Sequence, residues 1–336
     1  MFRRAVERPS PRMNVLGSRL LLLAALLAGF SGCAGDGSAP GESGDRAILY
    51  SSQPPDAAES LYMLDWGTRT PELLIEGDSV AAQGLASWSH GSDRIAYIRQ
   101  LGSRTELYVW SVTDSLSRRL GEQHLPPVVL FPDWSPSDDR LLVSAGSTHR
   151  ALGVYMVDVR TGDVWTLRSE ATSYRCPSWS PEGDRFAVAA YHDASSAILD
   201  MDTMGVTLDT LVMSDTTYLD CPQWSPSRDE VLYTVFHGGG LNGWERLTSH
   251  GDLARVDVGS HEVWPVTTGS GLANYGRWSP HGDWIVFQSD RGFPPTTDPD
   301  SLVRMLLNLD IYAVRRDGSG LIRLTENTYF DAHPAW

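Results

Sequence analysis

Two kinds of reactive side chain recur at fixed distances from tryptophan in this chain. Cys176 and Cys221 each lie three residues before a Trp, and His192 and His237 each lie thirteen residues after one. Thiols can pair as a disulfide or bind a soft metal ion, and neutral imidazoles are common metal ligands. Arg291 occupies the thirteenth position in a later copy of the pattern. A repeat therefore places these residues, and the elements that hold them must be identified first.

The repeat begins at a Trp-Ser pair. Its five copies are 45 to 54 residues apart and start at Trp88, Trp134, Trp179, Trp224 and Trp278. Each copy has an Asp five residues after the Trp, where it can hydrogen-bond the turn backbone, a role that we favour over metal binding. Alternating apolar residues follow, as in "RFAVAAY", and two more segments of this kind complete the unit. This alternation is typical of β-strands.

Four short antiparallel strands in about 45 residues describe one blade of a β-propeller. The Trp-Ser-Pro segments and "DIYAVRRDGSGLIRLTENTYFDAHPAW" (residues 310–336) resemble the TolB-type, WD40-like propeller repeat, over about residues 46–336. The resemblance implies an all-β fold of six blades with four antiparallel strands each. The segment from residue 46 lacks a first strand, and residues 331–336 look like a first strand without its continuation. We therefore predict that residues 331–336 complete the first blade and close the ring.

One end of such a ring carries the loops from second to third strands and from blade to blade. Both long insertions, residues 237–251 and 292–309, fall at this end, which we call the insertion face. Long loops on a rigid scaffold commonly bind partners, so we predict the binding face here. A second series of residues, three before each Trp, is expected near the channel mouth. The candidate binding residues from both series and from the insertions are His192, His237, Trp244, Arg291, Tyr275 and His333.

The chemistry of the recurring Cys and His residues stays partly open. Equivalent inner positions in a six-fold ring lie about 8 Å apart, near or beyond the limit of about 7 Å between Cα atoms that a disulfide allows. We favour free buried thiols, with a Cys176–Cys221 disulfide as the alternative. The His residues lack the short spacings of metal sites, so we interpret them as exposed loop residues. We predict no metal and no cofactor.

The N-terminal 32 residues have the pattern of a secretory signal. Basic residues precede an apolar run at residues 20–30, and small residues follow. The run is about 11 residues long, too short to span a bilayer as a helix. "SGC" resembles the lipobox of bacterial lipoproteins, with Phe30 where that pattern prefers Leu. This resemblance implies a lipid on Cys33, and Ala34 after it favours the outer membrane. Residues 33–45 are expected to form a flexible tether. Met13 remains an alternative start.

Charge limits the partners that the protein can bind. The chain has a net charge of −15, and removing residues 1–32 takes away five Arg and one Glu, which leaves −19. This charge excludes nucleic-acid binding, which needs a clustered basic surface. It is compatible with a basic partner or a divalent cation, or it serves only solubility.

Motifs for catalysis are weak. "HGGG" at residues 237–240 resembles the oxyanion-hole loop of lipases, but the chain has no Gly-x-Ser-x-Gly elbow. TolB-type proteins carry an α/β domain before the propeller, where we expect only the tether, so the resemblance transfers the fold and not the role. We predict a non-enzymatic envelope lipoprotein that binds a partner through the insertion face, and we favour a protein as that partner. The alternative is a periplasmic propeller that binds glycans or cleaves them as a metal-dependent lyase, with Arg as base because the chain has no Lys.

Overall fold

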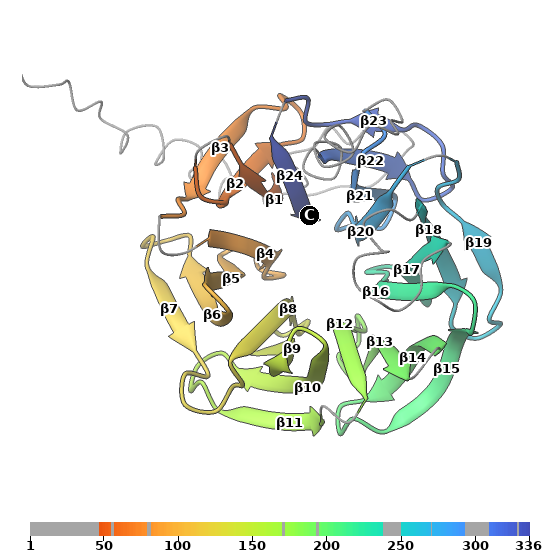
Figure 1. Cartoon of the computed structure of the whole chain (residues 1–336), viewed down its shortest axis with the longest axis horizontal. Helices are drawn as coiled ribbons and strands as arrows, with labels where there is room; N and C mark the ends of the chain where they lie inside the picture. The colour runs from red at the N-terminus through yellow and green to blue at the C-terminus, as the bar shows by residue number, and fades with distance from the viewer. Residues whose placement is uncertain are drawn as a thin grey trace, which may run out of the picture. The chain divides into compact units, whose positions relative to one another are not determined.

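The computed structural model describes residues 47–54, 57–78, 82–169, 172–192, 195–237, 250–269, 271–292, 309–327 and 329–336. They belong to one compact unit, Arg46–Trp336. The predicted signal (1–32), the tether (33–45) with Cys33, and Trp244 lie outside the described residues. Six four-stranded antiparallel sheets form a ring of blades (Figure 1). The predicted all-β, six-bladed propeller is confirmed. Within the described ranges, no helix has the length and hydropathy needed to cross a membrane.

In the first three blades the innermost strands, those nearest the channel, are β24, β4 and β8 (Figure 1). Blade one contains β24 (Phe330–Ala335), β1 (Ala47–Gln53), β2 (Ser60–Asp65) and β3 (Pro71–Ile75). Blade two contains β4 (Ala82–Trp88), β5 (Arg94–Leu101), β6 (Arg104–Ser111) and β7 (Ser117–Leu120). Blade three contains β8 (Val128–Trp134), β9 (Arg140–Thr148), β10 (Ala151–Asp158) and β11 (Val164–Arg168).

The remaining three blades follow the same order from the channel outward. Blade four contains β12 (Ser173–Trp179), β13 (Arg185–His192), β14 (Ser195–Asp202) and β15 (Thr207–Ser214). Blade five contains β16 (Tyr218–Trp224), β17 (Glu230–His237), β18 (His250–Asp257) and β19 (Val263–Pro265). Blade six contains β20 (Ala273–Trp278), β21 (Trp284–Ser289), β22 (Asp310–Arg315) and β23 (Ile322–Arg323).

The Trp-Ser motif makes the first turn of a blade and ties neighbouring blades together. In the turn, the Ser hydroxyl donates to the Asp carboxylate, as in Ser89–Asp93 at 3.0 Å. The Trp side chain packs between blades: Trp134 is 2% exposed, and its indole N–H donates to the carbonyl of Ser87 in blade two at 3.1 Å. Burying such a ring stabilises the fold by about 1.5–3 kcal/mol. The repeated Trp is therefore an element of blade-to-blade packing.

The ring is closed by the C-terminal strand, as predicted. β24 pairs antiparallel with β1, with Gln53 opposite Phe330 and Leu49 opposite Ala335. Beyond this strand, the Trp336 ring lies 4.7 Å from that of Trp66, between ring centroids. This pairing covers the inner edge of β1 and holds the strand that follows blade six inside blade one.

Candidate functional site

The innermost strand of every blade changes conformation at the same register, three residues before the motif Trp. The residue there has a positive φ, between 46° and 55°, and the strand pairing shifts register at this point. This is a β-bulge, which re-aims a side chain relative to the regular pleat. The six residues form what we call the channel ring: Leu85, Phe131, Cys176, Cys221, Tyr275 and His333. They lie midway along the innermost strands.

Side chains of the channel ring meet across the centre of the propeller. Phe131 belongs to blade three and Tyr275 to the opposite blade six, yet their ring centroids are 6.1 Å apart. Tyr275 also makes an edge contact with His333, at 4.9 Å between centroids. The bulges therefore fill the channel at this level with side chains.

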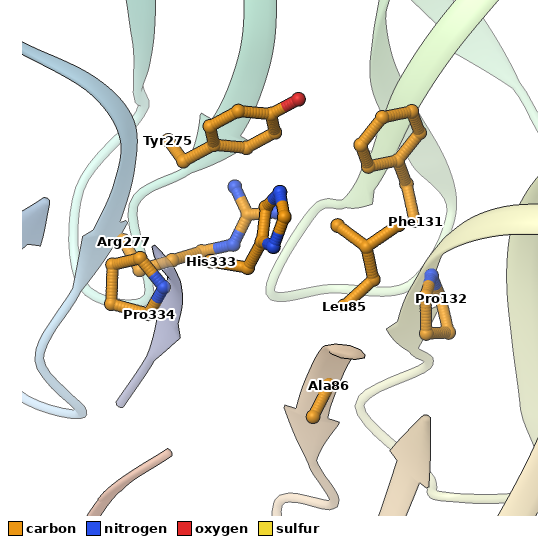
Figure 2. Close-up of a pocket in the computed structure, with 8 residues that line it drawn as sticks. All are labelled: Leu85, Ala86, Phe131, Pro132, Tyr275, Arg277, His333 and Pro334. Atoms are coloured by element: carbon orange, nitrogen blue, oxygen red, sulfur yellow. The ribbon is translucent and has the colours of Figure 1, made fainter. Parts of the chain in front are cut away.

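A small cavity lies beside the channel ring (Figure 2). Its volume is about 10 Å³, room for about one water molecule. Leu85, Phe131 and Pro132 give it an apolar wall, and Arg277 and His333 supply polar groups. The enclosed part of this cavity has no room for a sugar ring.

His333 is held by three polar groups. Its Nδ1 lies 3.2 Å from Ser51 Oγ and 3.9 Å from Glu59 Oε1. Its backbone N–H donates to Gln288 Oε1 at 2.7 Å. Burial, and secondarily the charge of Arg277, lower the pKa of His333 to about 4. Burial raises the pKa of Glu59, a change that its hydrogen bond with Ser51 opposes.

The Ser51–His333–Glu59 group is not arranged as a catalytic relay. A triad needs its hydroxyl on one imidazole nitrogen and its carboxylate on the other. Here both groups approach the same nitrogen, Nδ1, and Ser51 is fully buried. This geometry fits a structural role at the junction of β24 and β1.

On the insertion face, two of the predicted residues meet at a carboxylate. Asp252 Oδ2 lies 3.5 Å from His237 Nε2, and Asp252 Oδ1 lies 3.9 Å from Arg291 Nη2. His237 remains half exposed, whereas Arg291 is mostly buried and its cation lies over the Phe287 ring at 5.3 Å. Burial lowers the pKa of Arg291, and the charge of Asp252 opposes that change. Blades five and six thus share an ion-pair cluster at their boundary.

The structure separates the predicted binding residues into groups. His237 and Arg291 lie together on the insertion face, and Tyr275 and His333 lie together in the channel ring. His192 is exposed at the end of β13 in blade four. Trp244 belongs to residues 238–249, outside the described ranges, as do residues 293–308 of the second insertion.

Cys176 and Cys221 are free thiols, both buried, in adjacent blades. Between them lies Asp220, whose Oδ1 accepts hydrogen bonds from the Tyr191 hydroxyl at 2.6 Å and from the Cys221 N–H at 2.8 Å. Arg175 Nε is 3.9 Å from the same oxygen.

Sequence reasoning missed several residues of these clusters. Arg175 and Asp220 precede the two Cys residues directly, so comparing that position between the repeats would have revealed an opposite charge pair in adjacent blades. Glu59 and Asp252 lie outside the repeated motif. No spacing signal marks them.

Comparison with known proteins supports the fold. No family model and no curated protein matches the chain. TolB from Acinetobacter baumannii is similar in structure, with a TM-score of 0.64 and 18% identity over 87% of this chain and 66% of that chain. A putative TolB from Agrobacterium tumefaciens has a TM-score of 0.62 and 17% identity, over 83% of this chain and 89% of that chain. An oligogalacturonate lyase in complex with manganese has a TM-score of 0.51 and 11% identity, over 83% of this chain and 72% of that chain. These likenesses establish a TolB-like β-propeller fold.

Proposed function

We propose that the protein is a non-enzymatic propeller of the bacterial cell envelope that binds a protein partner through its insertion face. The observation that carries this proposal is the placement of the two insertions. In the sequence they fall between β17 and β18 and between β21 and β22, and the strand ends that flank them lie in adjacent blades at the same end of the ring. The strand ends that lead into them are joined through Asp252, which contacts both His237 and Arg291.

The channel supports this choice of surface. Its centre is filled by the channel ring, and the adjoining cavity has room for about one water molecule. A partner would therefore be recognised on the rim, where a rigid scaffold presents loops. The net charge of −19 without residues 1–32 favours a basic partner surface, chiefly through faster encounter.

Membrane attachment is part of the proposal and depends on Cys33. Acylation at the lipobox-like "SGC" would anchor the chain by about 0.8 kcal/mol per buried CH₂. Growth with a radiolabelled fatty acid tests this: label is expected in the natural chain and lost in Cys33→Ser. Cys176→Ser is the matched control and keeps the label. Label that persists in Cys33→Ser would refute the anchor, and density fractionation of membranes would decide between inner and outer membrane.

Site-specific photo-crosslinking in intact envelopes tests the binding face. A photoreactive amino acid is placed at His149 or His192, which are exposed on the insertion face, and at Glu182, which is exposed in a Trp-Ser-Pro turn on the opposite end. We expect the same discrete protein adduct from His149 and His192 and none from Glu182. An adduct from Glu182 alone would place the partner on the wrong end of the ring. Saturable oligosaccharide binding without any protein adduct would favour the glycan-binding alternative.

A further inference from the structure

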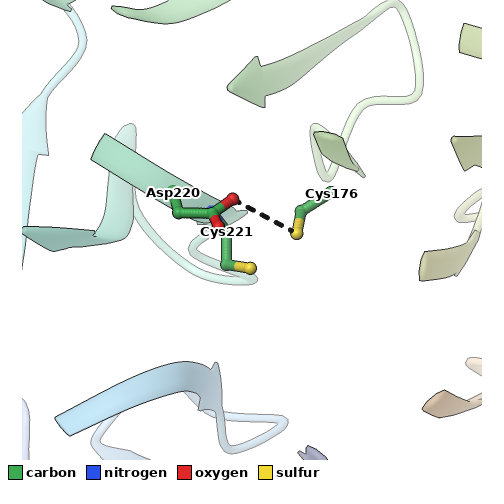
Figure 3. A group of neighbouring side chains, drawn as sticks. All are labelled: Cys176, Asp220 and Cys221. Carbon is green, nitrogen blue, oxygen red and sulfur yellow. Dashed lines mark hydrogen bonds between the residues drawn. The ribbon is translucent and has the colours of Figure 1, made fainter. Parts of the chain in front are cut away.

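Three potential metal donors converge inside the propeller. They are the sulfurs of Cys176 and Cys221 and a carboxylate oxygen of Asp220, and all three lie within 4.8 Å of one another. Figure 3 shows the two thiols and the carboxylate gathered between two adjacent blades. The residues are 1%, 3% and 4% exposed for Cys176, Cys221 and Asp220.

Backbone geometry brings the two sulfurs together. Cys176 in β12 and Cys221 in β16 occupy equivalent bulges, with φ of 50° and 46°. A non-glycine residue in this left-handed region costs roughly 1–2 kcal/mol, which the surrounding sheets must offset. Because both bulges face the same channel, equivalent side chains of neighbouring blades approach each other there. In the channel ring, only this pair of neighbours presents two soft donors.

The donor set selects a class of cation. Two sulfurs and one carboxylate oxygen suit a thiophilic divalent ion such as Zn²⁺, whereas Ca²⁺ and Mg²⁺ require six or more oxygen ligands. Zn–S bonds of about 2.3 Å in tetrahedral geometry place two sulfurs about 3.8 Å apart. Donors that already lie within 4.8 Å need to move by only about 1 Å or less to reach this arrangement.

The surrounding groups fit a bound divalent ion in charge and in orientation. Two thiolates and the Asp220 carboxylate would carry three negative charges, which one divalent cation and the Arg175 guanidinium balance. A buried cluster without net charge avoids the desolvation cost of an uncompensated ion. Asp220 is also held in place by the Tyr191 hydroxyl at 2.6 Å, the kind of outer contact that orients metal-binding carboxylates.

We propose that Cys176, Asp220 and Cys221 form a binding site for a zinc-type divalent cation at the centre of the ring, linking blades four and five. Three protein donors from the described residues leave the fourth tetrahedral position to water or to a small ligand. The site is separate from the insertion face, so its failure would leave the proposed partner binding untouched.

Titration of the full chain with Co²⁺ under reducing conditions tests the site. Tetrahedral Co²⁺ bound to thiolates gives a sulfur-to-cobalt charge-transfer band and visible d–d bands, which Zn²⁺ should abolish by displacement at a stoichiometry of one. Cys176→Ser and Cys221→Ser are expected to lose the charge-transfer intensity and to weaken Zn²⁺ binding by about 100-fold or more. Cys33→Ser, which changes the remaining cysteine, is the matched control and should bind normally.

A gentler variant guards against loss of the fold. Tyr191→Phe removes the hydroxyl that holds Asp220 and keeps the ring stacked on Tyr218, at 4.4 Å between centroids. We expect the variant to fold normally and to bind Zn²⁺ about 10–100-fold more weakly. The proposal is overturned if the natural chain shows no charge-transfer band, or if Cys176→Ser keeps the band at its full intensity. A Cys176–Cys221 disulfide that survives treatment with reductant, seen as a mass lower by two hydrogens, would also overturn it.

Discussion

Closure of the ring by the last strand predicts an energetic coupling between residues far apart in the chain. Trp66 follows β2 and is 9% exposed, and its ring lies 4.7 Å from Trp336 and 5.3 Å from Trp284 of blade six. Replacing a fully buried Trp with Ala costs about 3–5 kcal/mol, so we expect about 2 kcal/mol for the partly buried Trp336. The coupling free energy between Trp66→Ala and Trp336→Ala should be about 0.5–1.5 kcal/mol, the usual value for an aromatic pair.

A double-mutant cycle measures this coupling. Urea unfolding of the natural chain, Trp66→Ala, Trp336→Ala and the double variant is followed by far-ultraviolet circular dichroism, which does not depend on the removed fluorophores. Trp165 in β11 of blade three is the matched control, because its half-exposed ring lies in another blade and its change should add to that of Trp66. A Trp66–Trp336 coupling no larger than the control coupling would refute closure through this contact. Deleting residues 331–336 should go further and abolish cooperative unfolding of the ring.

Other predictions concern pH and backbone packing. Because the fold lowers the pKa of His333 from its ordinary value of 6.5 to about 4, stability present above pH 6.5 should be lost as pH falls toward 4, by up to about 3 kcal/mol. His333→Gln should flatten this part of a pH–stability profile, and an unchanged slope would contradict the assignment. Burial raises the pKa of Asp200 to about 6 despite its ion pair with Arg185, so the fold takes up protons there and stability should fall as pH rises from about 4 to 6. Asp200→Asn should remove this fall in chemical denaturation at several pH values. Gly146→Ala would force its methyl against the Ala151 carbonyl oxygen and should cost about 1–3 kcal/mol in the same assay, and a neutral effect would refute this packing.

Much of the fold could be predicted because the repeat carries its own register. The Trp-Ser pair marks the end of the innermost strand in blades two to six, and strand alternation after the turn gives the second strand, as Trp179 and β13 show. Counting back three residues from each Trp also identifies the members of the channel ring from the sequence alone. Closure could be predicted because the sequence of β24 resembles the other first strands. The second strand that should follow it is supplied by β1.

The site was harder to predict because its decisive contacts do not follow the repeat. Asp252 lies inside β18, yet it gathers His237 from the preceding strand and Arg291 from the next blade. No pattern in the sequence marks such a contact, which depends on how two blades are rotated against each other. The positive φ of the channel ring was equally hidden, since none of its residues is a glycine or an asparagine, the usual markers of that conformation.

This conformation explains how one scaffold can hold different chemistry at its centre. The bulge is a property of the innermost strand and occurs in all six blades, with an aliphatic, an aromatic, a thiol or an imidazole side chain at the same φ. A substitution at a bulge therefore changes the content of the channel without changing the strand pairing. The neighbouring position acts in the same way, since Arg175 and Asp220 precede the two cysteines and meet across the boundary between blades.

Exchanging these two residues, as Arg175→Asp with Asp220→Arg, would preserve the charge pair and remove the carboxylate from beside Cys221. If the cluster is a metal site, the exchange should weaken Zn²⁺ and Co²⁺ binding while the ring stays folded. If it serves only to hold the blades together, the exchange should largely retain stability, and neither the natural chain nor the exchanged variant should bind these ions.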